Sequence, residues 1–179
     1  AALSAGVAAV VLAIDDDGFR TLQFNVTHDD TRRKAFEHVP LPPYIAQNDT
    51  LAHEYQTVYA KPEGSLAAPT AGLHFTHELL NTIRPHHPLA EITLHVGLGT
   101  FAKLTEENLR TNTLHSEHFI INQEAADRLN QASHITAVGT TTIRTLESLK
   151  AQKDQFVQQV GETTIFIRPG YTFQAVDSV

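Results

Sequence analysis

Residues 64–76 hold the first group of side chains that could do chemistry. The run contains a proline, then Thr70, Gly72 and His74, a pattern typical of a tight loop that leads into a helix. Gly72 can take a positive φ or let a ligand approach the backbone closely. A histidine in such a loop can exchange a proton near neutral pH. The plainer interpretation is that His74 only packs among its apolar neighbours.

A second histidine, His95, lies in a predicted strand at residues 92–96 and is followed by Gly97 and Gly99. Glycines after a strand are typical of places where a ligand meets the backbone. The spacing is not that of a dinucleotide-binding glycine loop, so that function is not favoured. The alternative is a buried histidine with an internal hydrogen-bond partner.

The third group is His115, Glu117 and His118. On an extended segment His115 and Glu117 share a face and His118 points away. This arrangement allows a histidine–carboxylate pair in which Glu117 raises the basicity of His115. A solvated surface loop is the alternative. A metal site built from His115 and Glu117 with His74 and His95 is also conceivable, but no HExxH-type spacing supports it.

The fourth group is a threonine run that opens a helix after Gly139. Backbone N–H groups and hydroxyls at a helix start can bind a phosphate or a carboxylate, and Arg144 could add a bidentate contact. Simple N-capping by threonine is the alternative. Three tyrosines, Tyr55, Tyr59 and Tyr171, could stack on a base or be ordinary half-buried aromatics.

The elements that must position these groups change character along the chain. Predicted strands at residues 7–14 and 21–26, with an Asp-Gly turn between them, indicate that residues 1–30 are the end of an all-β, barrel-like domain. Residues 31–179 alternate strands and helices, which predicts part of an α/β catalytic domain, barrel-like or with a mostly parallel sheet. The expected helices are 31–38, 76–83, 105–109, 123–133 and 141–151, and the expected strands are 65–68, 92–96, 118–121, 135–138 and 163–167.

Composition limits the function classes. The 179 residues include no Cys, which excludes disulfides and thiolate metal sites and fits a reducing compartment. No apolar run is long enough to cross a bilayer. The net charge of −7 is unfavourable for phosphate contacts, although a local basic patch could coexist with it. The chain has no Met and begins in an apolar segment, so we expect an internal part of a longer protein.

Several uncommon sequence motifs occur in one order along the chain. Because of these motifs the chain resembles the S-adenosylmethionine:tRNA ribosyltransferase-isomerase family of queuosine biosynthesis. The resemblance runs from residue 39 over nearly all the rest of the chain. Two departures are visible: the family has Met where Leu114 stands, and a shorter Thr/Ser run near Thr142. The matching motifs are VPLPPYI (39–45), EYQTVYA (54–60), APTAGLHF (68–75), TLHVGLGTF (93–101), LHSE (114–117), AVGTTTIRTLES (137–148) and IFIRPGY (165–171).

The resemblance implies an enzyme that transfers and isomerises the ribosyl group of S-adenosylmethionine. The acceptor would be 7-aminomethyl-7-deazaguanine at the wobble position of the tRNA anticodon loop. The product would be epoxyqueuosine, with adenine and methionine released. No metal, further cofactor or membrane is implied, and we expect a cytoplasmic monomer. The alternatives are a metal-dependent hydrolase that uses the histidine cluster, or a non-catalytic tRNA- or nucleotide-binding fragment.

The reaction that the resemblance implies needs a general base, and our hypothesis is that His95 or His115 is that base, with Glu117 orienting it. His74 would be a second acid–base or base-contacting group. The residues expected to hold the methionine end or a tRNA phosphate are Thr140, Thr141, Thr142 and Arg144. The other residues expected to bind substrate are Thr70, Gly72, Gly97 and Gly99.

Overall fold

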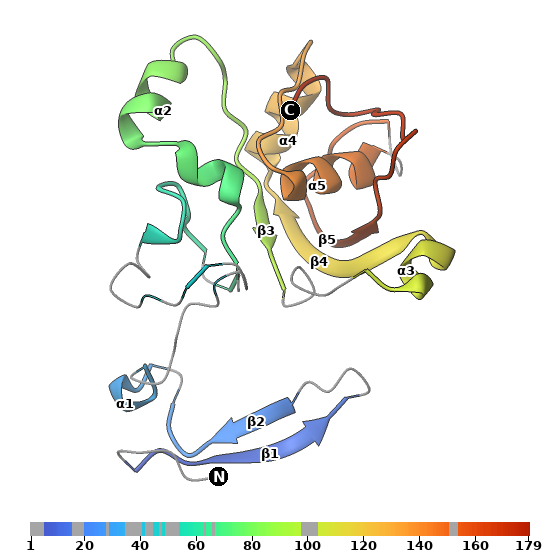
Figure 1. Ribbon diagram of the computed structural model, residues 1–179. Helices are drawn as coiled ribbons and strands as arrows, with labels where there is room; N and C mark the ends of the chain where they lie inside the picture. Colours follow the sequence, from blue (N-terminus) through green and yellow to red (C-terminus); the bar gives the residue numbers. More distant parts are fainter. Residues whose placement is uncertain are drawn as a thin grey trace. The chain divides into compact units, whose positions relative to one another are not determined.

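The chain forms two units, Ala1–His38 and Val39–Val179, in a computed structural model (Figure 1). The structure describes residues 6–15, 20–27, 29–34, 41, 45–46, 48, 54–62, 64–65, 67–97, 104–150 and 154–179, without the side chains of residues 33 and 34.

The first unit is built on a hairpin, as the Asp-Gly signal predicts. Its strands, β1 (Ala9–Ile14) and β2 (Arg20–Phe24), pair antiparallel. The side chain of Asn25 closes the open end of the hairpin by accepting from the Ala8 N–H at 2.7 Å and donating to the Gly6 carbonyl at 3.0 Å. Helix α1 (Thr31–Lys34) follows, and the rest of the predicted helix lies outside the described residues.

The second unit contains a three-stranded sheet in the order β3 (Thr93–His95), β4 (Thr113–Ile121) and β5 (Gln159–Ile165). The predicted mixture of helices and strands is confirmed, but the described strands pair antiparallel rather than mostly parallel. Two helices, an even number, lie between β4 and β5, so the chain enters β5 in the direction opposite to β4. The one parallel contact in the described part is an isolated bridge between Thr136 and Ser178.

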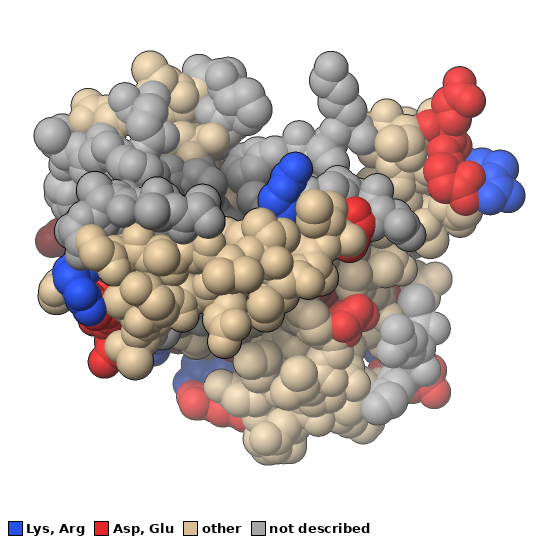
Figure 2. Space-filling view, turned by 90° about the horizontal axis from the view of Figure 1, so that it is seen from below, with Lys and Arg blue, Asp and Glu red and all other residues tan. Residues whose placement is uncertain are grey.

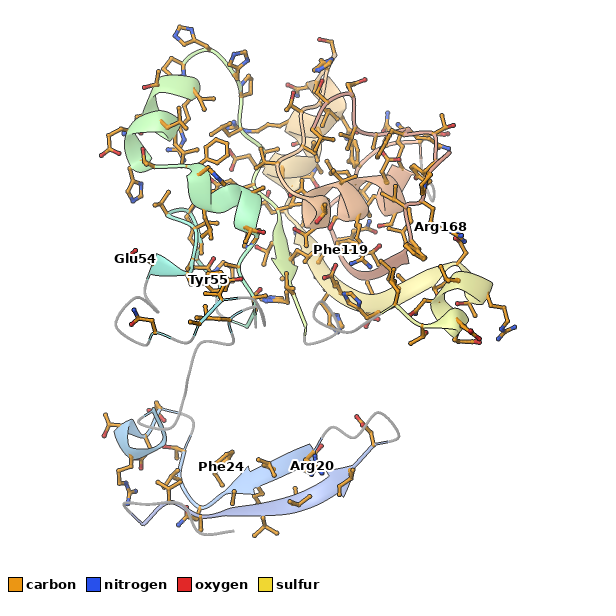
Figure 3. The ribbon with its side chains drawn as sticks, viewed as in Figure 1. Arg20, Phe24, Glu54, Tyr55, Phe119 and Arg168 are labelled. Atoms are coloured by element: carbon orange, nitrogen blue, oxygen red, sulfur yellow. The ribbon has the colours of Figure 1, made fainter. Side chains whose placement is uncertain are left out.

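Two helices, α4 (Gln123–Gln131) and α5 (Thr140–Lys150), follow β4 and pack on the sheet (Figure 1). Alternation along β4 buries Glu117, Phe119 and Ile121 and exposes the residues between them. Phe119, labelled in Figure 3, joins the hydrophobic core that α4 and α5 supply with Leu129, Ile143, Leu146 and Leu149. Gly161 of β5 faces this ring, because a Cβ there would lie 2.8 Å from Phe119 Cζ.

The remaining helices begin where the sequence predicts. Thr76 caps α2 (His77–Ile83) by accepting from the Leu79 N–H at 3.1 Å, and Asn122 caps α4 by accepting from Ala125 N–H at 2.8 Å. Thr105 forms a capping box with Asn108 at the start of α3 (Glu106–Thr111). No helix among the described ranges has the length and apolar character needed to span a bilayer.

Two predicted strands of the second unit are not formed. Residues 65, 67 and 68 do not form a strand, because the Ser65 hydroxyl, rather than a backbone ladder, binds β3: it donates to the Leu94 carbonyl at 3.1 Å and accepts from the Val96 N–H at 3.2 Å. Residues 135–138 contribute only the bridge at Thr136. The last strand starts earlier than predicted, at Gln159.

Helix α5 holds the end of the described chain through Glu147, whose side chain is fully buried. Its carboxylate accepts hydrogen bonds from the Tyr171 hydroxyl and from the N–H groups of Gln174, Ala175 and Val176, at 2.9 to 3.0 Å. Burial and this carboxylate raise the pKa of Tyr171 to about 12, so the phenol keeps its proton and remains a donor at neutral pH. Four donors on one buried carboxylate fix residues 171–176 against α5.

Replacing Glu147 with Gln is expected to lower the free energy of unfolding by about 3 kcal/mol, because the amide NH₂ faces N–H groups that lose their acceptor. Urea unfolding of the full-length protein checks the loss, and hydrogen exchange at residues 174–176 locates it. Glu124→Gln, on the exposed side of α4 beside Arg128, is the matched control and should leave both readouts unchanged. Equal behaviour of the two variants would contradict the anchoring role.

Candidate active site

His115, Glu117 and Arg144 form a connected cluster between β4 and α5. The His115 Nε2 atom lies 3.3 Å from Glu117 Oε1, as the shared face of the strand predicts. The other Glu117 oxygen accepts from Arg144 Nη1. Arg144 also donates from Nη2 to the His115 carbonyl and from Nε to the Ile165 carbonyl, each at 3.1 Å. The guanidinium therefore ties β4, β5 and the carboxylate together.

Burial decides what this cluster can do. The Glu117 and Arg144 side chains are 1% and 10% exposed, whereas that of His115 is 28% exposed and so reaches the solvent side of the cluster. Burial lowers the pKa of Arg144, and the Glu117 carboxylate beside it acts in the opposite direction. An arginine keeps its proton in proteins, so the paired Glu117 oxygens are acceptors.

The tautomer of His115 follows from that charge. An ionised carboxylate can only accept, so the hydrogen bond to Glu117 requires the proton of the neutral ring to be on Nε2. In that tautomer the ring lone pair is on Nδ1. A carboxylate that fixes a histidine tautomer in this way is the orienting part of known acid–base arrangements.

The start of α5 lies beside the 3₁₀ helix η2 (Thr70–His74). Gly139 has φ +89°, and a Cβ there would lie 3.8 Å from the Ala71 Cβ. The structure thus brings together two predicted motifs, the Thr70–His74 segment and the threonine run. Thr142 donates its hydroxyl to the Val138 carbonyl, four residues earlier, at 2.8 Å. Thr140 is exposed, and Thr141 is partly buried.

Gly72 is buried under Tyr59, since a Cβ on Gly72 would lie 2.1 Å from the Tyr59 hydroxyl oxygen. The requirement for glycine here is therefore close packing by the protein itself. The Tyr59 ring also contacts Phe75 edge-on at 6.5 Å between centroids, and burial raises the pKa of Tyr59. His74 is exposed at the end of η2.

His95 lies on the other face of the sheet from the His115–Glu117–Arg144 cluster. It pairs with His118, and paired residues project to the same face, whereas the adjacent Glu117 projects to the opposite one. On that face His118 Nε2 lies 3.4 Å from Glu162 Oε1. Gly97 follows His95 with open space where a Cβ would be. Gly99 lies outside the described residues.

The predicted site residues therefore fall into separate groups in the described structure. Glu117, His115 and Arg144 are joined, and η2 lies beside the start of α5, but His95 is on the opposite face. The pairing of Arg144 with Glu117 was not anticipated from the sequence, where Arg144 was predicted as a ligand contact. The alternation of buried residues along the strand places the Glu117 carboxylate inward, and a buried carboxylate requires a cation. This alternation is the sequence signal for the pairing.

In the ranges that the structure describes, no three His, Asp or Glu side chains are placed to hold a metal ion.

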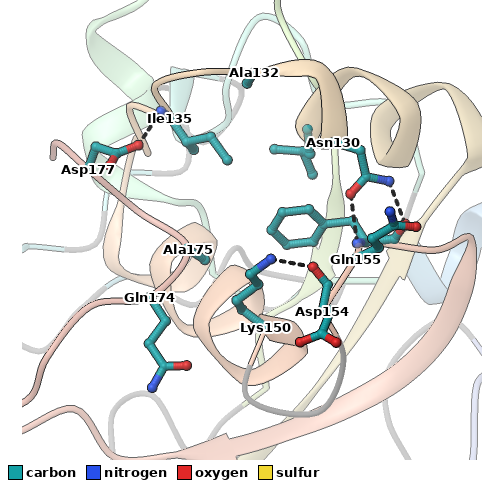
Figure 4. A pocket seen from close by; sticks show the side chains of 11 residues that line it. Asn130, Ala132, Ile135, Lys150, Asp154, Gln155, Gln174, Ala175 and Asp177 are labelled. Atoms are coloured by element: carbon teal, nitrogen blue, oxygen red, sulfur yellow. Dashed lines mark hydrogen bonds between the residues drawn. The ribbon is translucent and has the colours of Figure 1, made fainter.

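A pocket of about 350 Å³ lies beside α4 and the end of α5 (Figure 4), lined in part by Asn130, Lys150 and Gln174. Asn130 binds the Phe156 backbone twice, and Lys150 binds the Asp154 carbonyl. None of the predicted site residues lines this pocket.

The second unit thus presents a mixed α/β scaffold in which a buried Glu117–Arg144 ion pair lies beside the partly exposed His115. A family model described as queuosine biosynthesis protein matches residues 2–179, so the chain belongs to that family.

Curated relatives agree with this membership. The S-adenosylmethionine:tRNA ribosyltransferase-isomerase of Clostridium kluyveri is 44% identical over 178 residues, covering 96% of this chain and 52% of the relative. The protein of that name from Staphylococcus epidermidis is 49% identical over 146 residues, covering 79% and 43%. That from Treponema denticola is 45% identical over 169 residues, covering 90% and 49%. The chain spans about half the length of these relatives.

Proposed function

We propose that this chain is part of an enzyme that transfers and isomerises the ribosyl group of S-adenosylmethionine onto 7-aminomethyl-7-deazaguanine at the tRNA wobble position. The product is epoxyqueuosine, and adenine and methionine are released. The observation that carries the proposal is the family match over residues 2–179, together with relatives that bear this activity in their names. The enzyme uses S-adenosylmethionine as substrate and no further cofactor.

The His115–Glu117–Arg144 cluster supports a role for His115 as general base. The reaction needs removal of a proton from the carbon beside the sulfonium, where the positive sulfur makes that proton acidic. His115 Nδ1 takes the proton, and Glu117 holds the ring through Nε2. Arg144, whose Nε, Nη1 and Nη2 all have protein partners, holds Glu117 in place rather than meeting the ligand.

The start of α5 supports binding of an anionic group. Thr140 and Thr141 stand where backbone N–H groups point out of the helix, and η2 lies beside them. We assign this position to the methionine carboxylate or a tRNA phosphate, with Thr70 and His74 at its margin. Figure 2 shows one face of the molecule, on which the described Lys and Arg side chains are scattered rather than gathered in one patch. Phosphate contacts with the backbone N–H groups at helix starts would compensate for the lack of one basic patch.

We propose that the chain contributes to two domains of the enzyme. We assign residues 1–30 to the end of an all-β, barrel-like domain and residues 31–179 to part of the α/β catalytic domain. The enzyme acts as a monomer in the cytoplasm on the anticodon loop.

The test is release of adenine from S-adenosylmethionine by the full-length protein, measured with tRNA that carries 7-aminomethyl-7-deazaguanine. We expect release to depend on the modified tRNA, with the Clostridium kluyveri relative as positive control. Chelator should leave the rate unchanged. Binding of S-adenosylmethionine without release would favour a non-catalytic binding fragment, and activity that a chelator abolishes would favour a metal-dependent hydrolase.

A further inference from the structure

Helix α5 holds the chain that follows β5 at two points, about one helical turn apart. Arg144 donates from Nε to the Ile165 carbonyl at 3.1 Å. Glu147, three residues later, accepts from the Tyr171 hydroxyl at 2.9 Å and from the first N–H groups after residue 173. The segment between these points is called here the 166–173 arch. Because both holding side chains are buried in the same helix, the two ends of the arch are fixed.

The arch presents an aromatic ring to solvent. Among the aromatic residues that the structure describes, Phe173 alone is exposed, at 45%. Its ring meets the ring of Tyr171 edge-on, at 5.4 Å between centroids and 75° between planes. Tyr171 is itself held through its hydroxyl, so the Phe173 ring has a fixed support and an open surface. Such a ring is suited to stacking on an unpaired base.

A cation lies on the same arch. Arg168, labelled at the edge of the second unit in Figure 3, is exposed, and its Cζ lies 5.6 Å from the centroid of the Phe166 ring. Its Nη1 atom makes only long contacts, at 3.4 Å to the Leu109 carbonyl and 3.5 Å to Asn112 Oδ1. Within the described ranges Nε and Nη2 have no partner, so this edge of the guanidinium can bind a phosphate through two hydrogen bonds.

The arch borders the candidate active site. The Arg144 guanidinium that holds Ile165 also donates to the His115 carbonyl at 3.1 Å, so the arch begins beside the residue assigned as base. A tRNA whose wobble base reached His115 would bring the neighbouring nucleotides of its anticodon loop to this part of the surface. Their bases are unpaired and open to stacking. Their phosphates need cations, which a chain of net charge −7 offers at few places.

We infer that the 166–173 arch binds the unpaired anticodon loop of the tRNA, with a base stacked on Phe173 and a phosphate of the same loop on Arg168. This inference rests on the proposed function. Stacking and charge act together on surfaces that bind single-stranded nucleic acid, and neither contact reads the identity of the base. The arch therefore positions the loop, and other residues recognise the 7-deazaguanine.

The stacking contact is tested by fluorescence anisotropy, with the full-length protein and an anticodon stem-loop RNA that carries 7-aminomethyl-7-deazaguanine. Phe173→Ala should weaken binding about 5- to 150-fold, the usual loss for one stacked base, and Phe173→Trp should keep it. Phe173→Leu retains an apolar side chain beside Tyr171 but no π-face, so most of the loss should remain. Val160→Ala, at a residue of β5 that is 74% exposed, is the matched control and should bind like the native protein.

The phosphate contact is tested by the salt dependence of the same binding. Arg168→Gln should reduce the slope of log Kd against log salt concentration by about 0.7, the value for one phosphate of a single strand. Arg84→Gln removes another exposed arginine, which pairs with Glu91, and should leave the slope unchanged. A purely structural role of Arg168 would lower the melting temperature without changing the salt slope.

Native-like binding by Phe173→Ala, or an unchanged salt slope in Arg168→Gln, would overturn the inference. A lower melting temperature of Phe173→Ala without weaker RNA binding would also overturn it, because Phe173 would then be covered by protein. If Phe173→Ala fails to fold, Phe173→Trp decides: its added fluorescence should be quenched by the bound RNA, and unquenched fluorescence would contradict stacking. Failure of the proposed function would look different, since the native protein would release no adenine while RNA binding still depended on Phe173 and Arg168.

Discussion

Replacing Arg144 with Met is expected to lower the free energy of unfolding by about 3–5 kcal/mol, since it leaves the Glu117 carboxylate buried without its cation. Glu117 is 1% exposed, and Arg144 supplies it with a direct ion pair while also binding two backbone carbonyls. Urea unfolding of the full-length protein measures the change. Adenine release should fall with it, because Glu117 would no longer be held to orient His115.

The matched control for this variant is Arg110→Met. Arg110 also pairs with a glutamate, Glu107, at 2.5 Å, but both side chains are well exposed. Exposed pairs contribute little to stability, so the unfolding midpoint should stay where it is. Similar losses in the two variants would show that burial does not govern the Arg144 pair.

A double variant separates stability from chemistry. Glu117→Leu combined with Arg144→Met removes both charges, and replacing a buried ion pair by apolar side chains is often neutral for folding. We therefore expect the double variant to recover most of the stability that Arg144→Met loses and still to lack adenine release. Recovery of activity along with stability would contradict the orienting role of Glu117.

Local features of the fold could be predicted from the sequence because they depend on neighbouring residues. Thr76 and Asn122 cap the helices that follow them, and the Asp-Gly signal lies between two paired strands. The alternation that joins His115 with Glu117 and turns His118 away is also local, and the structure has it. These predictions needed no knowledge of which element packs on which.

The positions that sequence reasoning could not supply depend on distant pairings. The partner of Glu117 is Arg144, 27 residues further along the chain on α5. Neither segment by itself predicts that α5 packs over β4. The face on which His95 lies depends on the register that pairs it with His118, and a slip by one residue would move it to the opposite face. Ser65 was predicted in a strand, but its hydroxyl forms the bonds that a ladder would otherwise supply.

Replacing His115 with Gln is expected to lower kcat for adenine release by about 100- to 10,000-fold, the usual contribution of a general base. The amide can still donate to Glu117, so the cluster keeps that hydrogen bond, but it cannot take a proton. Because His115 is partly exposed, the unfolding midpoint should change little.

Steady-state kinetics of the full-length protein with modified tRNA measure the loss. His134→Gln, at an exposed histidine that contacts Ser178, is the control. An amide substitutes for a hydrogen-bond donor and not for a base, so a large loss in His115→Gln assigns the base role to His115. If His115→Gln stayed active while His95→Gln did not, the base would be His95 instead.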